Sequence, residues 1–545
     1  MANTSKQSLG VIVLLVFMIF YKPVLARKNK ILMAQMAGDS SHSQFTVDLA
    51  KTLSARGNEV WIVDSIECYN WRTEYRNYSE IKFVLFQKRI PFFTIGKLLV
   101  NRYIARNLHS SSANSALQYQ LEAENTELFA NLTDGRTLNI FTLASYELDD
   151  MISNTEVITK LKAVGFDMIV GDTVPLYQVT LSQLLKVPFI NFGLLPMAPS
   201  QNDRFAYNPS NAAYVPERMS FLTDTMTFKE RVKNTLLYWI TSFFYYKYCL
   251  GPMDDILQKH NIRPDANFGQ LMSEAQMWIF NSDFVVDFPR PLSPHVKFVG
   301  GVMSGPASPL DEEWQAFVDS SGEHGVVLLA LGTLISDGLT EEQSTTIAAS
   351  LSLLPQKVVW GYSGKIPTNV GNNTKIVKWI PQNDLLGSPK VRAFISHGGL
   401  SSIHQCIYHA VPMVGIPVFG DQKDNFIRLD AKGMSLHLDI RTMTDRTLYD
   451  AIIQVIYNRT FKENAERLSE IARDRPTSLS PAEETAYWIE YAIKHGTEHL
   501  KPYALQLSFI QYYLLDVIAF HVVIVVLICW LVRRMCCSAS RRLVK

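Results

Sequence analysis

A glycine turn beside polar side chains is the stretch of this sequence best suited to chemistry. An apolar run at 393–396 leads into the turn 397–399, which reads His-Gly-Gly, and helical spacing follows over 400–409. Two glycines at such a junction let the backbone approach a ligand, and the unpaired N–H groups of a helix N-terminus attract negative charge. The pattern predicts a phosphate or diphosphate site, although a tight turn that binds nothing would also use glycines.

The residues around this turn favour a nucleotide. Trp379 and Gln382 stand beside a proline, where they are suited to stack on a flat base and to bond its edge. Asp421 and Gln422 follow a second apolar run, 411–419, and open α/β sheets bind ligands at the exits of their strands. Together these residues predict a pocket for a nucleotide that carries a polar group.

A histidine in the first part of the chain is the candidate general base. His42 lies between a predicted strand, 30–36, and a predicted helix, 45–56, and a helix N-terminus lowers a histidine pKa, which keeps the ring neutral. Asp172 ends another predicted strand, 167–170, and parallel strands share an exit edge, so we expect the two side chains to be neighbours. A histidine oriented by a carboxylate can take a proton from a hydroxyl. The structural alternatives are a helix cap at His42 and a simple turn at Asp172.

The elements that must position these residues alternate between short apolar runs and helical patterns. They do so on both sides of segment 287–294, whose three prolines exclude a helix interior or a central strand. This predicts an α/β fold of two facing, doubly wound domains. The expected divisions are an N-terminal domain at 27–286, a linker at 287–301 and a C-terminal domain at 302–500.

Both ends of the chain carry apolar segments. Residues 1–26 have the basic, apolar and small-residue pattern of a secretory signal peptide. Residues 514–532 are almost all apolar and long enough to span a bilayer, and the tail 533–545 is basic with no acidic residue. By the positive-inside rule the tail is cytoplasmic and the preceding chain luminal, which predicts a single-pass type I protein. Four glycosylation sequons in the luminal part fit this topology, at Asn77, Asn131, Asn372 and Asn458.

Composition excludes some function classes. The 545 residues suffice for two domains, and a net charge of +1 gives no reason to expect nucleic acid as a partner. Of the six cysteines, only Cys68, Cys249 and Cys406 precede the anchor, and no C-x-x-C pattern indicates zinc or a disulfide framework. The aromatic run 238–246 is too short to span a membrane; it is either buried core, the commoner case, or a segment that lies on the membrane surface.

The motifs in order resemble a known family. W-I-P-Q-N-D-L-L-G at 379–387, F-I-S-H-G-G at 394–399 and P-M-V-G-I-P-V-F-G-D-Q-K-D-N at 412–425 are similar to the signature of the membrane-bound UDP-glycosyltransferases, which include UDP-glucuronosyltransferases and UDP-glucosyltransferases. The resemblance covers essentially the whole chain. It implies a GT-B type fold in the endoplasmic reticulum membrane, with both domains luminal. It also implies that helix 480–495 returns to the N-terminal domain before the anchor.

The resemblance implies an inverting, metal-independent transfer of glucose or glucuronate to a hydroxyl of a small lipophilic acceptor. No cofactor is expected, because the UDP-sugar is a co-substrate, and the sequence has no D-x-D motif for a metal. His42 and Asp172 match the family's base and its partner, and Asp421 and Gln422 match the residues that hold the sugar. The residues expected to contact UDP are Thr333, Trp379, Gln382, His397, Gly399, Ser401 and Gln405.

Three positions depart from the family pattern. Ser401 stands where Asn is usual, and Gln405 stands where a Glu binds the ribose, a change worth about 1 kcal/mol of donor binding. Asn281 stands where the glucuronate-using branch has Arg, which favours UDP-glucose. A pseudoenzyme or a luminal lipophile-binding protein with weakened donor binding is the alternative function. The pattern leaves a homo-oligomer open.

Overall fold

The computed structural model describes residues 27–35, 41–71, 75, 77–89, 140–174, 176–194, 196–332, 335 and 338–543. The predicted signal peptide, the sequon at Asn131 and the predicted UDP contact Thr333 lie outside the described residues.

Seven parallel strands form the sheet of the N-terminal domain, in the order β3-β2-β1-β4-β5-β6-β7. Successive side chains of β1 face opposite sides, so Ile31 and Leu32 belong to separate cores. The central strands β4 and β5 are buried along their whole length because helices cover both faces of the sheet. The strands are β1 (Lys30–Ala34), β2 (Glu59–Ser65), β3 (Ile81–Phe86), β4 (Met168–Asp172), β5 (Phe189–Gly193), β6 (Trp278–Phe280) and β7 (Val296–Phe298).

Helices of the N-terminal domain divide between the two faces of its sheet. α2 (Ser41–Ala55) shares a core with Ile31, whereas residues of α7 (Ile140–Ser153) and α9 (Tyr177–Leu185) share a core with Leu32. The remaining helical segments are α3 (Ile66–Trp71), α8 (Thr155–Val164), α10 (Pro199–Phe205), α11 (Phe228–Phe244), the π-helical η3 (Tyr245–Leu250), α12 (Gly251–Lys259) and α13 (Phe268–Met272).

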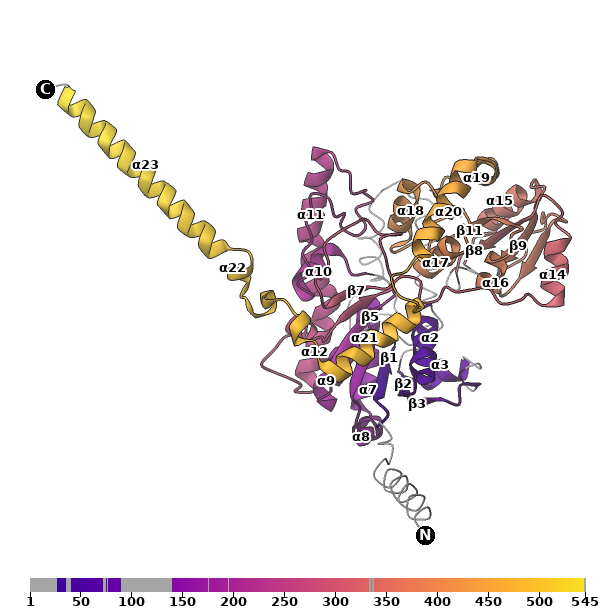
Figure 1. Cartoon of the computed structure of the whole chain (residues 1–545), viewed down its shortest axis with the longest axis horizontal. Helices are drawn as coiled ribbons and strands as arrows, with labels where there is room; N and C mark the ends of the chain where they lie inside the picture. Colours follow the sequence, from indigo (N-terminus) through magenta and orange to yellow (C-terminus); the bar gives the residue numbers. More distant parts are fainter. Residues whose placement is uncertain are drawn as a thin grey trace, which may run out of the picture.

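Six parallel strands form the sheet of the C-terminal domain, in the order β10-β9-β8-β11-β12-β13. The predicted pair of doubly wound α/β domains is thus confirmed (Figure 1). The strands are β8 (Val326–Ala330), β9 (Lys357–Gly361), β10 (Thr374–Val377), β11 (Val391–Ser396), β12 (Met413–Gly415) and β13 (Ser435–His437). The helices are α14 (Glu312–Asp319), α15 (Glu341–Ser352), α16 (Gln382–Leu386), α17 (Leu400–Tyr408), α18 (Gln422–Ala431), α19 (Asp445–Tyr457) and α20 (Arg459–Arg473).

The boundary between the domains differs from the predicted linker 287–301. Residues 287–293 form no helix or strand, as their prolines require, but β7 follows within a few residues and pairs in parallel with β6. The first sheet therefore ends at Phe298, inside the predicted linker. All of the prolines precede β7, so none has to donate a hydrogen bond to the sheet.

A helix after the C-terminal domain returns to the N-terminal domain, as the resemblance implied. α21 (Pro481–His495) is capped by Ser480, whose side chain accepts the N–H of Glu483. Its Ile489 is fully buried in the core beneath α2. Arg56, directly after α2, donates to both carboxylate oxygens of Glu490 at 3.1 and 2.7 Å. This helix therefore joins the end of the C-terminal domain to the N-terminal domain.

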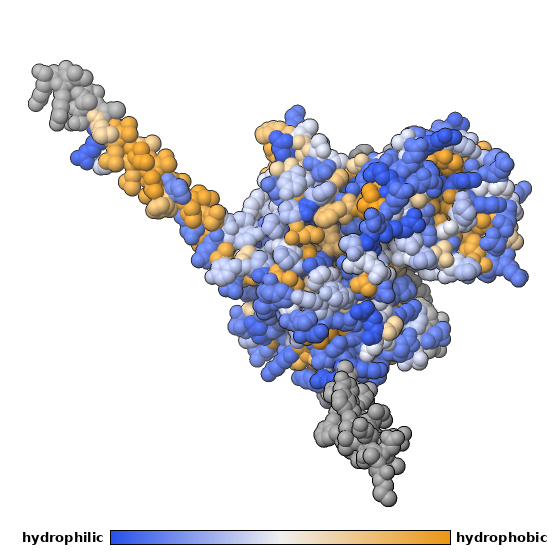
Figure 2. Space-filling view, in the orientation of Figure 1, coloured by the Kyte–Doolittle hydropathy of each residue, from blue (hydrophilic) through white to orange (hydrophobic). Residues whose placement is uncertain are grey.

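The chain ends in one long apolar helix. Two short 3-10 turns, η4 (Glu498–Leu500) and η5 (Tyr503–Gln506), and α22 (Phe509–Tyr512) lead to α23 (Leu515–Leu543). Among the described residues, 515–535 is the one span long and apolar enough to cross a membrane. α23 projects away from both domains, and its surface is apolar for most of its length (Figures 1 and 2).

Candidate active site

His42 and Asp172 meet where the strand order of the first sheet reverses. β1 and β4 are adjacent, so the chain leaves both strands at the same edge of the sheet. His42 lies in the first turn of α2, and its Nδ1 is 2.5 Å from Oδ2 of Asp172. The other oxygen of Asp172 accepts the backbone N–H of Val174 at 2.9 Å. The carboxylate is buried and held at both oxygens, so it orients the imidazole.

The pKa of His42 differs from the prediction. Burial lowers this pKa, but the charge and hydrogen bond of Asp172, together with the charge of Asp421, raise it above its ordinary value. A lowered pKa had been expected from the helix N-terminus. That expectation is wrong because two carboxylates outweigh both burial and the helix dipole.

The turn 397–399 lies at the corresponding point of the second sheet, where β8 and β11 are adjacent. Gly398 has a φ of +92°, and a Cβ there would lie 2.6 Å from the ring of Phe426. The ring of His397 lies against Gly332 and Gly399, where added Cβ atoms would come within 2.9 and 2.7 Å of it. Burial lowers the pKa of His397 to about 4, so this imidazole is neutral. Small residues thus surround the turn and leave the start of α17 open to a ligand.

Hydrogen bonds connect three of the residues that are predicted to contact UDP, namely Gln382, Gln405 and Ser401. The amide of Gln382 donates to Oε1 of Gln405 at 2.6 Å, and Gln405 donates to the carbonyl of Met303 at 3.0 Å. Ser401 lies 3.3 Å from the sulfur of the same Met303. Ser401 and Gln405, two of the three residues that depart from the family pattern, therefore contact the segment that joins the domains. The side chain of Trp379 is 74% exposed and free to stack on a base.

On the other side of the turn, Asp421 is held in place by a residue that the sequence analysis did not single out. Asn425 donates to Asp421 at 2.6 Å and to the carbonyl of Gly398 at 3.0 Å. Its position one helical turn after Asp421 was the available signal. The oxygen of Gln422 accepts the N–H groups of Val418 and Phe419, so it shapes the loop before α18.

Comparison with known proteins identifies the family of this chain. The sequence model of the UDP-glucuronosyl and UDP-glucosyl transferase family matches residues 29–545. The chain belongs to this family. UDP-glucuronosyltransferase 2C1 of Oryctolagus cuniculus is 42% identical over 398 residues, which cover 73% of this chain and 78% of the relative. The 2-hydroxyacylsphingosine 1-beta-galactosyltransferase of Rattus norvegicus is 40% identical over 399 residues, with 73% and 72% covered.

Solved structures show the same fold. The glycosyltransferase of kitacinnamycin aligns with a TM-score of 0.55 at 15% identity and covers 86% of this chain and 100% of its own. The calicheamicin glycosyltransferase aligns with a TM-score of 0.54 at 15% identity, with 86% and 99% covered. These likenesses establish the GT-B fold, and the relatives establish that the protein is a UDP-glycosyltransferase.

Polar contacts join the two domains of this UDP-glycosyltransferase. The carboxylate of Asp424 on α18 accepts the N–H groups of Met219 at 2.6 Å and Phe221 at 3.3 Å, both from the N-terminal domain. Arg428, on the same helix, pairs with the buried Asp287 at 3.0 Å. The exit edges of the two sheets therefore face each other. Sequence spacing contains no signal for these contacts, since about two hundred residues separate Asp424 from its partners and Arg428 is also far from Asp287 in the chain.

Asn281 has a structural role. Its side chain is fully buried, and its oxygen accepts the N–H groups of Gly301 at 2.9 Å and Val302 at 3.0 Å. The amide thus holds the segment that leaves the first sheet.

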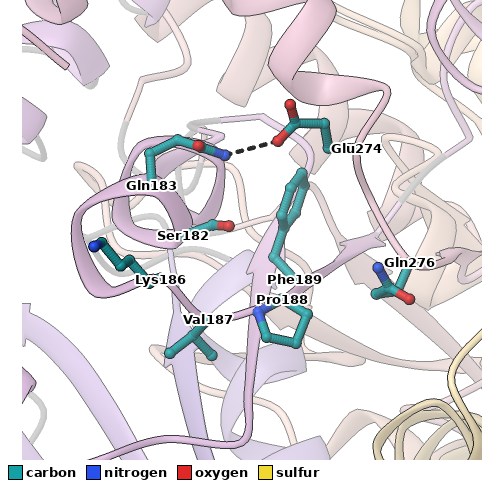
Figure 3. A pocket seen from close by; sticks show the side chains of 8 residues that line it. All are labelled: Ser182, Gln183, Lys186, Val187, Pro188, Phe189, Glu274 and Gln276. Carbon is teal, nitrogen blue, oxygen red and sulfur yellow. Dashed lines mark hydrogen bonds between the residues drawn. The ribbon is translucent and has the colours of Figure 1, made fainter. Parts of the chain in front are cut away.

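A pocket of about 380 Å³ lies away from His42 and Asp172 (Figure 3). It is lined by residues around the end of α9 and the start of β5, and the amide of Gln183 donates to Glu274 at 2.9 Å across it. His42 and Asp172 lie at the opposite ends of the strands, so this pocket is separate from the active site. Within the described residues, no group of three or more His, Cys, Asp or Glu side chains is arranged to hold a metal.

Proposed function

We propose that this UDP-glycosyltransferase carries out an inverting transfer of glucose or glucuronate to a hydroxyl of a small lipophilic acceptor. The observation that carries the proposal is the His42–Asp172 pair, at 2.5 Å, on the domain that faces Asp421 and the glycine turn. The base and the expected donor site belong to different domains, so donor and acceptor would meet in the cleft between them.

In the proposed mechanism the acceptor oxygen attacks the anomeric carbon while His42 takes its proton. Asp172 accepts a hydrogen bond from Nδ1–H, which leaves Nε2 as the basic atom. The bond between the anomeric carbon and the diphosphate oxygen breaks as the new glycosidic bond forms. The negative charge that develops on UDP would be stabilised by the N–H groups at the start of α17, after the turn 397–399. No metal takes part in this scheme.

The remaining roles follow the positions of the side chains. Trp379 stacks on the uracil and Gln382 bonds its edge, while Gln405 and Ser401 face the ribose and Asp421 and Gln422 hold the sugar hydroxyls. The neutral His397 adds a donor near the diphosphate without adding charge. Thr333, outside the described residues, directly follows Gly332 and keeps its proposed diphosphate contact.

The proposed donor is either UDP-glucose or UDP-glucuronate. The relatives named above include enzymes whose names specify glucuronosyl and galactosyl transfer at similar identity. Asn281, at the position where the glucuronate-using branch has Arg, favours glucose. We place the protein in the endoplasmic reticulum membrane as a type I protein, because one apolar helix follows the catalytic domains and basic residues follow it.

The deciding experiment measures UDP release by the detergent-solubilised full chain, with UDP-glucose and UDP-glucuronate supplied separately and with phenols and lipophilic alcohols as acceptors. We expect acceptor-dependent release that His42→Ala abolishes and that EDTA leaves unchanged. The His42→Ala variant should still bind UDP, since its binding residues lie on the other domain. If neither donor turns over and UDP does not bind, the protein is a pseudoenzyme or a lipophile carrier instead.

A further inference from the structure

Helix α11 exposes an apolar face to solvent. Phe228 is 72% exposed, Leu236 57% and Phe243 62%, and Val232, Trp239 and Ile240 are exposed between them. These positions recur at intervals of three and four residues, so they form one stripe along the helix. Run 238–246, for which the sequence left buried core and a membrane-surface segment as alternatives, is divided: Tyr238 and Tyr245 are buried, but Trp239, Ile240 and Phe243 face outward.

The orientation of this helix is set by polar groups on its inner face. The buried Asn234 accepts the N–H of Glu217 at 2.7 Å and donates to the carbonyls of Ala212 and Val215 at 2.8 and 2.9 Å. The inner face of α11 is thus the hydrogen-bonded one and the outer face is apolar, the reverse of an ordinary surface helix. A stripe of six large apolar residues held outward in this way fits an apolar partner.

A buried carboxylate joins α11 to the start of the membrane anchor. Asp203 accepts hydrogen bonds from the hydroxyls of Tyr238 on α11 at 2.5 Å, Tyr512 at 2.6 Å and Tyr513 at 3.3 Å. The last two tyrosines lie just before α23. We call Asp203 and the three tyrosines that donate to it the tyrosine clamp. It ties the outward-facing helix to the point where the chain enters the membrane.

The exposed apolar surface continues from the anchor toward α11. Phe509 and Ile510, just before the clamp tyrosines, and Leu514, just after them, are exposed as well. α11 and α23 rise from the same side of the N-terminal domain, and apolar residues gather at the tip of α11 (Figures 1 and 2). Lys229 and Lys233 flank the stripe, in the pattern of a helix that lies in a lipid interface.

We propose that the apolar face of α11 lies in the interfacial layer of the bilayer that α23 crosses, and that the tyrosine clamp holds it at that depth. The partner is a lipid surface. A second copy of this chain would also cover apolar residues, but it would not explain why the helix is bonded to the root of the anchor.

The proposal is tested with the full chain in phospholipid nanodiscs that contain some anionic lipid. A nitroxide is attached to Leu236→Cys or to the matched control Leu353→Cys, whose side chains are 57% and 56% exposed. The parent for both carries Ser at Cys529, Cys536 and Cys537, since the cysteines at 68, 249 and 406 are buried. Collision with oxygen, which concentrates in lipid, is compared with collision with a water-soluble nickel chelate by power-saturation EPR.

We expect oxygen to dominate at position 236 and the nickel chelate to dominate at position 353. Dominance of the chelate at both positions would refute the membrane contact. Protection of position 236 from both reagents, with spin–spin broadening, would identify a second copy of the chain as the partner and refute it equally.

The clamp is tested by adding Tyr512→Phe and Tyr513→Phe to the labelled Leu236→Cys protein. Tyr238 keeps its bond to Asp203, so the N-terminal domain retains its internal contact. The oxygen preference at position 236 should fall toward that of the control, while UDP binding stays unchanged as a check on folding. An unchanged oxygen preference would show that the clamp does not set the depth of α11.

Discussion

At the scale of single residues, two carboxylates act on one imidazole from different domains. Asp172 bonds His42 directly, and Asp421 adds its charge from the C-terminal domain. The raised pKa makes His42 a stronger base than a free histidine, but it must be deprotonated before it can act. The pH dependence of the reaction therefore reports on this pair.

Asp172→Asn should move the acid limb of the kcat/KM profile to lower pH. The unprotonated His42 is the active form, so activity rises as pH passes through its pKa. Removing the charge of Asp172 leaves burial as the main influence, and burial lowers this pKa. The maximal rate should fall by roughly 10²–10⁴-fold because the ring loses its orienting partner.

A second histidine–carboxylate pair supplies the control for this profile. Asp430 on α18 lies 2.6 Å from His437 on β13, and it belongs to no proposed contact with substrate. Asp430→Asn should leave the acid limb where it is. If Asp172→Asn also leaves it unchanged, His42 is not the group that titrates.

Gln405→Glu should tighten UDP binding and lower the melting temperature. A carboxylate offers the ribose hydroxyls a charge-assisted bond worth about 1 kcal/mol, which is roughly fivefold in affinity. It cannot donate to the carbonyl of Met303, as Gln405 does at 3.0 Å, so the folded state loses a bond. Titration calorimetry with UDP and thermal unfolding measure the two effects.

Gln276→Glu is a suitable control for the Gln405 variant. Gln276 lines the remote pocket, and its oxygen accepts from Thr497 at 2.8 Å, a role that a carboxylate can keep. Neither UDP affinity nor stability should change much. Weaker UDP binding in Gln405→Glu would contradict the proposed ribose contact.

At the scale of elements, the turn between β11 and α17 depends on close packing with α18. Gly398 adopts a left-handed backbone, and the ring of Phe426 occupies the space that its Cβ would need. Asn425, beside Phe426, bonds the carbonyl of Gly398 as well. The turn and α18 therefore form one unit that sets the diphosphate and sugar contacts together.

Gly398→Ala should weaken UDP binding about tenfold or more. The left-handed conformation costs an alanine about 1–2 kcal/mol, and the overlap with Phe426 adds to that. Gly305→Ala is the matched control, because no atom lies within 4 Å of its added Cβ. Fluorescence titration with UDP compares the two variants. Equal affinities would mean that the turn does not hold the nucleotide.

At the scale of the whole molecule, the proposed catalysis requires the two domains to keep a fixed position relative to each other. The base lies on the N-terminal domain, the glycine turn lies on the C-terminal domain, and Asp424 bonds across the cleft between them. The return helix α21 adds a second tie at the back of the N-terminal domain. Removing one of these contacts should therefore lower kcat/KM more than it weakens UDP binding.

Asp424→Ala should lower kcat/KM about tenfold and leave the Kd for UDP unchanged. Two backbone N–H groups lose their acceptor, at a cost of about 1–3 kcal/mol each if they stay buried, so the cleft would open. Asp450→Ala, which removes only an exposed partner of Arg446 on α19, is the control. Kinetics and UDP calorimetry on both variants separate the effects. A weaker Kd for UDP in Asp424→Ala would place this residue in the nucleotide site instead.

The local pattern of the sequence was sufficient for the architecture. Alternation of apolar runs with helical spacing predicted two α/β domains, and 19 apolar residues predicted the anchor. Strand exits placed His42, Asp172 and the turn 397–399 at sheet edges. These features depend on residues close together in the chain, where spacing reports directly on structure.

What the tertiary structure decided was every property that depends on distant contacts. His42 and Asp172 are 130 residues apart, and only the order of the strands makes them neighbours. The direction of the His42 pKa needed Asp172 from another strand, with Asp421 of the other domain acting in the same direction, and the outward face of α11 needed Asn234 and the tyrosine clamp. Spacing along a chain cannot report these, because the free energy of such a contact depends on how elements pack and not on where they lie in the sequence.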